Sequence, residues 1–251
     1  MILVIARHEL RRLFYSPLAW SILALVQLIL AFLFLTAVQN YIDNVMPKLA
    51  GMANAPGVVS LVLTPFFLWA GVIMLGITPI LTMRGFSEEY QTGSMALLIA
   101  APLSVSEIVL GKYFGLVAFL SVMIAMITLM PLSLSLGTSL DWGHLQAQIL
   151  GLFLLTASFA AAGLYISSLT RQPALAAVGG FGFLLLLFVF YVAGTAQGTQ
   201  SQLFVYISHF SHYLPFLRGE FSTRALAYYL LFALTFLGLT IRQLDNQRLP
   251  R

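Results

Sequence analysis

The sequence contains no cysteine and few charged residues. With no cysteine among the 251 residues, disulfide bonds, zinc-thiolate sites and thiol nucleophiles are all excluded. Only 8% of the residues are charged, against about 25% in a typical soluble domain. Hydrophobic residues make up 60% of the chain, and the mean hydropathy is +0.96. This composition indicates a membrane protein that crosses the bilayer several times.

Charge is also missing from the middle of the long apolar runs. A helix that spans a bilayer needs about 20 residues, and the runs of that length lie at about 18–40, 58–83, 107–134, 147–169, 174–196 and 225–243. The strongly polar residue inside them is Gln27. Ion-coupled carriers and proton relays need charges within the membrane, so their absence disfavours a secondary transporter. We predict one all-α transmembrane domain over residues 1–251 with six spans.

Residues 1–15 have the pattern of an amphipathic helix. The apolar face carries Leu3, Ala6, Leu10, Leu13 and Phe14, and the polar face carries Arg7, His8, Arg11 and Arg12. Such a helix lies in the membrane interface, although an ordinary soluble helix has the same pattern. Ser16-Pro17 predicts the start of a new helix. The first apolar run exceeds the roughly 7–15 residues of a signal peptide, so we expect it to remain as a span.

The basic residues predict the orientation in the membrane. If both termini are cytoplasmic, nine basic residues lie on the inner side and three on the outer side. The inner residues are Arg7, Arg11, Arg12, Arg84, Lys112, Arg171, Arg242, Arg248 and Arg251, and the outer residues are Lys48, Arg218 and Arg224. Cytoplasmic segments carry an excess of Lys and Arg, so we predict cytoplasmic termini.

A charged stretch separates the second and third runs. Burying its five charges in hydrocarbon would cost roughly 2.5–3.5 kcal/mol each, so we expect the stretch to be in contact with water. The charges are Arg84, Glu88, Glu89, Glu107 and Lys112.

The same stretch has the pattern of a short helix. Glu88 and Glu89 suit a helix start, Gly93 suits its end, and an apolar patch follows at 95–101. A helix of this kind lies on the membrane surface and offers one face to a soluble partner, although a solvated loop fits the same residues. Ser104-Val-Ser-Glu107 then has the capping-box pattern that starts the third span.

Two groups of residues suggest metal ligands but fit other roles better. His209 and His212 lie three residues apart without an acidic residue at a convincing ligand spacing, so we expect them to be surface histidines. They belong to the aromatic segment 197–224, in which we expect short outer helices, a structured loop being the alternative. A methionine stripe on the third run suits Cu(I), but such stripes more often pack a core. Its members are Met123, Met126 and Met130.

Local motifs resemble those of a known family. Arg84-x-x-x-Glu-Glu-x-x-x-Gly93, Leu97-Leu98-x-x-x-Pro102-x-Ser104 and Ile108-Val-Leu-Gly-Lys112 resemble the first inner loop of ABC-2-type transporter permeases. The tail is similar to the gliding-motility and copper-enzyme-maturation permeases within that family. It reads His212-Tyr-Leu-Pro-Phe-x-Arg218-Gly, Tyr228-Tyr229 and Phe236-Leu-x-Leu-Thr240.

The resemblance implies a multi-subunit machine in the bacterial cytoplasmic membrane. A dimer of a separate ATPase, which binds ATP and Mg, would dock on a short coupling helix that carries Glu88 and Glu89. Arg84 would precede that helix, Gly93 would end it, and Arg171 in the second inner turn would make a smaller contact. A second permease would complete the unit, either the same chain or a paralogue with a large outer domain. ATP hydrolysis would drive substrate export or force on extracytoplasmic partners.

Other functions fit less well. Gly111-Lys112 is followed by Tyr113 and lacks the earlier glycine of a phosphate-binding loop, so we predict no ATPase activity in this chain. Glu88-Glu89 resembles the glutamate pair of a metal-dependent membrane protease family, which needs an arginine where this chain has Gly93. There is no His-Glu-x-x-His motif. We therefore predict no catalytic residue, metal ligand, bound cofactor or nucleic-acid partner. An ATP-independent channel or carrier is the alternative function.

Overall fold

The computed structural model describes residues 1–49, 57, 59–95, 103–137, 140–195 and 202–248. Every regular element among these residues is helical, which confirms the all-α prediction. Within these described ranges, six helices are long and apolar enough to cross a membrane, as predicted. They are Pro17–Asn40 (α2), Thr64–Thr82 (α4), Val105–Ser133 (α7), Trp142–Leu169 (α8), Pro173–Thr195 (α9) and Thr223–Arg248 (α12).

Several helix ends differ from the predicted span limits, because helices continue into polar segments that hydropathy does not mark. α2 continues into a π-helical stretch, Tyr41–Val45 (η1), and then into α3, Met46–Leu49. A second π-helical stretch, Val59–Leu63 (η2), precedes α4. α8 begins at Trp142 rather than at 147, since the Asp141 carboxylate accepts hydrogen bonds from two backbone amides of its first turn.

Two predicted helix starts are in place. The backbone N–H of Glu107 donates to Ser104 Oγ (3.2 Å) and that of Ser104 donates to Glu107 Oε2 (3.1 Å), which confirms the capping box of α7. α7 ends in a short 3-10 turn, Leu134–Leu136 (η3). α2 begins at Pro17 as predicted, but the Ser16 hydroxyl makes no capping hydrogen bond. The fixed φ of proline favours a helix start without that bond.

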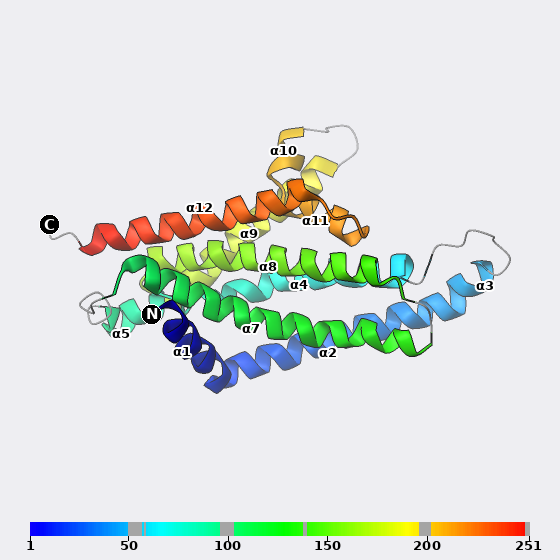
Figure 1. Ribbon diagram of the computed structural model, residues 1–251, viewed down its shortest axis with the longest axis horizontal. Coiled ribbons are helices and arrows are strands. Elements are labelled where there is room, and N and C mark those ends of the chain that lie inside the picture. Colours follow the sequence, from blue (N-terminus) through cyan, green and yellow to red (C-terminus); the bar gives the residue numbers. More distant parts are fainter. Residues whose placement is uncertain (50–56, 58, 96–102, 138–139, 196–201, 249–251) are drawn as a thin grey trace.

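The long helices run side by side along one axis (Figure 1). Both termini lie at one end of this bundle, together with the short helix α5, Ser87–Thr92. We call this end the termini end. α3 and the last turn of α7 lie at the opposite end, which we call the far end.

α8 occupies the centre of the bundle and packs against α4, α7, α9, α11 and α12. Small residues make this possible. A Cβ atom on Gly151 would lie 2.5 Å from Cβ of Phe216, and one on Gly163 would collide with Thr82. Ala160, Ala161 and Ala162 are fully buried as well. This alanine and glycine cluster therefore serves packing within the chain.

The predicted amphipathic helix is present as α1, Ile2–Tyr15, which crosses the termini end obliquely to the bundle axis (Figure 1). It packs on α7, where two glycines allow a close approach. A Cβ atom on Gly111 would lie 2.6 Å from Cβ of Ile5, and one on Gly115 would lie 2.8 Å from the carbonyl oxygen of Ala6. Any larger residue at these positions would push α1 away from α7.

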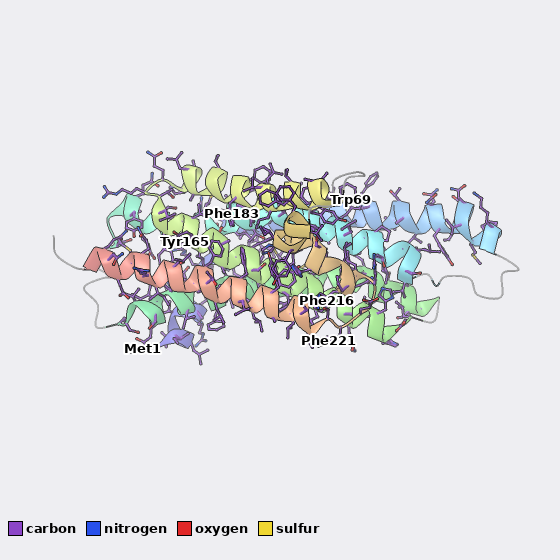
Figure 2. All side chains as sticks on the ribbon, turned by 90° about the horizontal axis from the view of Figure 1, so that it is seen from above. Met1, Trp69, Tyr165, Phe183, Phe216 and Phe221 are labelled. Carbon is purple, nitrogen blue, oxygen red and sulfur yellow. The ribbon has the colours of Figure 1, made fainter. Side chains whose placement is uncertain are left out.

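Two short helices precede α12, as predicted: α10, Gln202–Ile207, and α11, His209–Leu217. α11, which carries the Phe216 labelled in Figure 2, is embedded in the bundle. The side chains of Phe210, Tyr213 and Phe216 are buried. The Tyr213 hydroxyl donates to the backbone oxygen of Phe67 at 2.9 Å, which ties α11 to α4.

Side chains from two long helices also hold the end of α11. The carbonyl oxygen of Leu217 accepts hydrogen bonds from Thr64 Oγ1 (3.1 Å) and Gln148 Nε2 (3.0 Å), and His144 Nε2 lies 2.8 Å from it. A carbonyl at a helix end needs partners from outside the helix, and α4 and α8 supply them here.

The expectation that His209 is a surface residue is wrong. Its side chain is fully buried and stacks on the ring of Phe159, with 5.7 Å between the ring centroids. Nδ1 lies 3.0 Å from the Tyr228 hydroxyl. Burial and, to a smaller extent, the neighbouring His212 lower the pKa of His209 to about 3, so the ring is neutral at pH 7. Aromatic neighbours from α8 and α12 create an environment that spacing along the chain does not reveal.

Candidate functional site

α5 lies at the termini end and has the predicted form. Glu88 and Glu89 stand in its first turn, and it ends at Gly93 with a φ of 75°. This left-handed conformation is one that glycine adopts without strain. Both predictions, the acidic start and the glycine stop, are confirmed. Most of the predicted apolar patch, from residue 96 onward, lies outside the described residues.

A serine from another helix caps the start of α5. Phe86 occupies the N-cap position and has no side-chain acceptor. Instead, Ser167 of α8 accepts hydrogen bonds at its Oγ from the backbone N–H groups of Phe86 (3.0 Å) and Ser87 (3.2 Å). Its own hydroxyl donates to the carbonyl oxygen of Met83 at 3.0 Å. The turn that leads into α5 is therefore fastened to α8.

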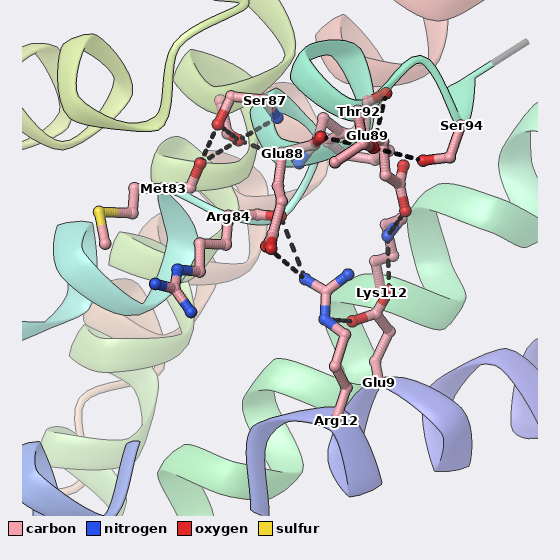
Figure 3. Close-up of polar contacts among 12 residues, drawn as sticks. Glu9, Arg12, Met83, Arg84, Ser87, Glu88, Glu89, Thr92, Ser94 and Lys112 are labelled. Atoms are coloured by element: carbon pink, nitrogen blue, oxygen red, sulfur yellow. Dashed lines mark hydrogen bonds and ion pairs between the residues drawn. The ribbon is translucent and has the colours of Figure 1, made fainter. Parts of the chain in front are cut away.

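Ion pairs join α5 to two further helices (Figure 3). The Lys112 ammonium on α7 lies 2.5 Å from Glu9 Oε1 on α1 and 2.5 Å from Glu89 Oε1 on α5. The exposed fractions of the Lys112, Glu9 and Glu89 side chains are 3%, 11% and 15%. The expectation that this charged stretch is in water is therefore wrong for Lys112 and Glu89. They are buried because opposite charges compensate one another.

Arg12 extends this ion cluster. Its Nε lies 3.4 Å from Glu9 Oε2, and its Nη2 lies 3.9 Å from Glu88 Oε2 and donates to the carbonyl oxygen of Arg84 at 3.1 Å. The Arg84 guanidinium points away from the others (Figure 3). We use the name ion cluster for Glu9, Arg12, Glu88, Glu89 and Lys112, which come from α1, α5 and α7.

The ion cluster has three carboxylates and two cations. Burial raises the pKa of Glu89, and the charge and hydrogen bond of Lys112 oppose this rise. Glu89 Oε2 is buried without a hydrogen-bond partner among the described residues. Tyr90 adds a tie to the last helix, because its hydroxyl donates to Gln247 Oε1 on α12. Burial raises the pKa of Tyr90 as well.

The opposite face of α5 remains open. Gln91, Thr92 and Gly93 are exposed, and the exposed fraction of the Glu88 side chain is 40%. Arg171 is exposed in the turn between α8 and α9, close enough to lower the pKa of Tyr90 slightly by its charge. The structure thus gathers Arg84, Glu88, Glu89, Gly93 and Arg171 at the termini end. It turns Glu89 inward and leaves Glu88 at the surface.

The site also contains residues that were not predicted for it, among them Glu9, Arg12, Lys112 and Ser167. Glu9 carried a signal, since it is the acidic residue of an otherwise basic amphipathic segment. Lys112 carried one too, because a lysine inside the start of a span needs a counter-charge. No signal in the sequence marked Ser167, because its role depends on how α4 and α8 pack. Among the described residues there is no group of three His, Asp or Glu side chains that could hold a metal ion.

Comparison with known proteins agrees with this architecture. A family model described as ABC-2 family transporter protein matches residues 3–241. The match covers α5, α7 and all of α1 except its first residue, and so it includes the whole ion cluster. No protein of curated function matches the sequence. The family match does not distinguish the gliding-motility and copper-enzyme-maturation subgroup, so that resemblance stays a prediction.

Proposed function

Because the chain belongs to the ABC-2 transporter family, we propose that it is a transmembrane permease subunit whose motion is driven by a separate ATPase docked on α5. The observation that carries this proposal is the two-sided environment of α5. One face is fastened to α1, α7, α8 and α12, while the other is exposed at the termini end. A helix held in this way passes a push from a soluble partner to the bundle.

The docking surface would consist of the exposed face of α5 with the neighbouring α8–α9 turn. Glu88, Gln91 and Thr92 offer polar contacts, and Arg171 adds a positive charge beside them. In this proposal the termini end faces the cytoplasm of a bacterial cell, in agreement with the distribution of basic residues. ATP and Mg would be bound by the ATPase dimer alone.

The ion cluster would relay the displacement of α5. Lys112 connects Glu89 to α7, and Glu9 and Arg12 connect the same cluster to α1. Buried ion pairs resist separation, because breaking one leaves an uncompensated charge in a low-dielectric site. α7 runs from the cluster to the far end of the bundle, so movement of its start alters the far end as well.

The output at the far end would be export of a substrate or force on extracytoplasmic partners. The middle of the spans lacks acidic and basic residues, which suits an apolar path or a helix set that only transmits motion. A second permease, the same chain or a paralogue with a large outer domain, would complete the membrane unit.

Single cysteines test the docking surface without background, because the chain has none of its own. Gln91 on α5 and Asn44 at the far end are both exposed, polar residues, and each is replaced with cysteine in turn. We expect Gln91→Cys to crosslink to the ATPase that co-purifies with the tagged chain, and Asn44→Cys to remain uncrosslinked. A membrane-impermeant thiol reagent applied to intact cells should label only Asn44→Cys. Labelling of Gln91→Cys from outside, or a purified complex without a nucleotide-hydrolysing subunit, contradicts the proposal.

A further inference from the structure

A groove of about 300 Å³ lies between α10, α11 and the first half of α12, far from the ion cluster. Eight of the residues that the structure describes line it, and none of these eight is acidic. It shares no residue with the proposed docking surface. Its two ends differ in chemistry, which restricts what it can bind.

One end of the groove is polar and carries a positive charge. Arg224 is exposed in the first turn of α12, and Tyr206 and His212 line the groove beside it. His212 Nε2 lies 2.9 Å from the carbonyl oxygen of Tyr206, and the His212 ring stacks on Tyr228 with 3.9 Å between centroids. Burial lowers the pKa of His212, the hydrogen bond to the Tyr206 carbonyl opposes this change, and the charge of Arg224 lowers the pKa again. The net shift is downward, so His212 is neutral at pH 7. The charge at this end is therefore that of Arg224.

The other end of the groove is apolar and follows a membrane span. Arg224, Ala227, Leu231 and Thr235 recur at intervals of three and four residues, so they share one face of α12. At 1.5 Å per residue this face extends about 16 Å from the arginine along the helix. Ala227, Leu231 and Thr235 are exposed, and the ring of Phe232 forms part of the wall.

We propose that this groove binds one anionic phospholipid from the leaflet at the far end, with its phosphate beside Arg224 and an acyl chain along Leu231 and Thr235. A ligand that matches both ends must be an amphiphile with a negative head. The groove opens along a membrane span, where phospholipids supply that chemistry at high concentration. The lipid would fill the junction of α10, α11 and α12. This proposal does not depend on ATPase docking. The proposed orientation of the chain serves only to identify the leaflet at the far end as the outer leaflet.

Native mass spectrometry of the whole chain, purified from mixed phosphatidylglycerol and phosphatidylcholine, tests the site. We expect the wild type to retain phosphatidylglycerol in preference to phosphatidylcholine. Arg224→Gln should reduce phosphatidylglycerol retention about fivefold, the factor expected for one basic residue near an anionic surface, and leave phosphatidylcholine unchanged. Arg218→Gln is the matched control, because Arg218 is exposed at the end of α11 but does not line the groove. It should leave both lipids unchanged.

A second pair of variants tests the apolar end. Ala227→Leu narrows the groove and should reduce retention of both lipids, whereas Leu230→Phe, at an exposed position outside the groove, should not. Added phosphatidylglycerol should raise the Tm of the wild type more than that of Arg224→Gln, because a ligand stabilises the state that binds it. Equal retention of the two lipids by the wild type overturns the proposal. So does an Arg224→Gln variant that keeps wild-type retention, or an Arg218→Gln variant that loses as much.

Discussion

Replacing Lys112 with methionine tests the ion cluster most directly. Methionine keeps the length and helix propensity of the side chain and removes only the ammonium group. Lys112 is 3% exposed and lies 2.5 Å from both Glu9 and Glu89, so its loss leaves two buried carboxylates facing each other. Arg12, at 3.4 Å, remains as a partner for Glu9. Glu89 would have no close counter-charge.

The expected cost follows from this geometry. Removing one partner of a buried ion pair costs about 3–5 kcal/mol, because the other charge stays buried and uncompensated. For a chain of about 150–250 residues, 1 kcal/mol corresponds to about 2–4 °C in Tm, so we expect Lys112→Met to lower the Tm by roughly 6–20 °C. Adding Glu89→Gln should restore part of the loss, since the carboxylate that has no other partner is then removed.

Thermal unfolding followed by tryptophan fluorescence measures these changes. Trp20 reports on the region of α1, because its Nε1 donates to the carbonyl oxygen of Phe14 at 2.7 Å. Lys48→Met is the control, since Lys48 is exposed in α3 and its loss should change the free energy of unfolding by less than about 0.5 kcal/mol. The reasoning is refuted if Lys112→Met unfolds with the wild-type Tm, or if Glu89→Gln gives no recovery.

Three further predictions concern other contacts. Ser167→Ala should cost about 0.5–2 kcal/mol and increase hydrogen exchange in α5, because it removes the cap of that helix. Ser168→Ala, which removes only a bond within α8, should leave α5 protected. Gly151→Ala should destabilise the fold by about 1–3 kcal/mol in denaturant unfolding, since its Cβ would overlap an aromatic side chain of α11. Gly182→Ala, with no atom near its Cβ, should not destabilise the fold. The pKa of His209 is about 3 in the folded chain and about 6.5 in the unfolded chain, so the unfolded state takes up a proton first as the pH falls. The contribution of His209 to stability should therefore decrease by about 1.4 kcal/mol between pH 7.5 and 5.5, and His209→Gln should remove this contribution in Tm measurements. The lowered pKa of His212 leaves a remaining dependence of the same sign.

Local signals in the sequence predicted the parts of the fold that depend on neighbouring residues. The Ser104 and Glu107 capping box, the helix start at Pro17 and the helix stop at Gly93 each involve residues within one turn. Their geometry is set by backbone hydrogen bonds at helix ends and by the conformational freedom of glycine. Hydropathy located six spans for a similar reason, because each span must be apolar along its own length.

Contacts between distant segments could not be predicted in this way. Lys112 and Glu9 are 103 residues apart in the sequence, and their meeting depends on two glycines that let α1 approach α7. His209 was expected at the surface because no acidic residue lies at a convincing ligand spacing from it, yet aromatic side chains from α8 and α12 enclose it. In both cases a polar side chain is buried against a particular partner, Glu9 for Lys112 and Tyr228 for His209, and the pattern along one segment does not show that partner.

The two glutamates of α5 now have different roles, although they are adjacent in the sequence. Glu89 faces Lys112 in the interior, so Glu89→Lys places two buried cations together and should destabilise the fold. Glu88 is 40% exposed and lies 3.9 Å from Arg12, so Glu88→Lys should leave the fold intact and weaken ATPase recovery in a pull-down. Reversing both at once would confuse loss of docking with loss of structure. A Glu88→Lys variant of normal Tm that recovers the full amount of ATPase would remove this residue from the docking surface.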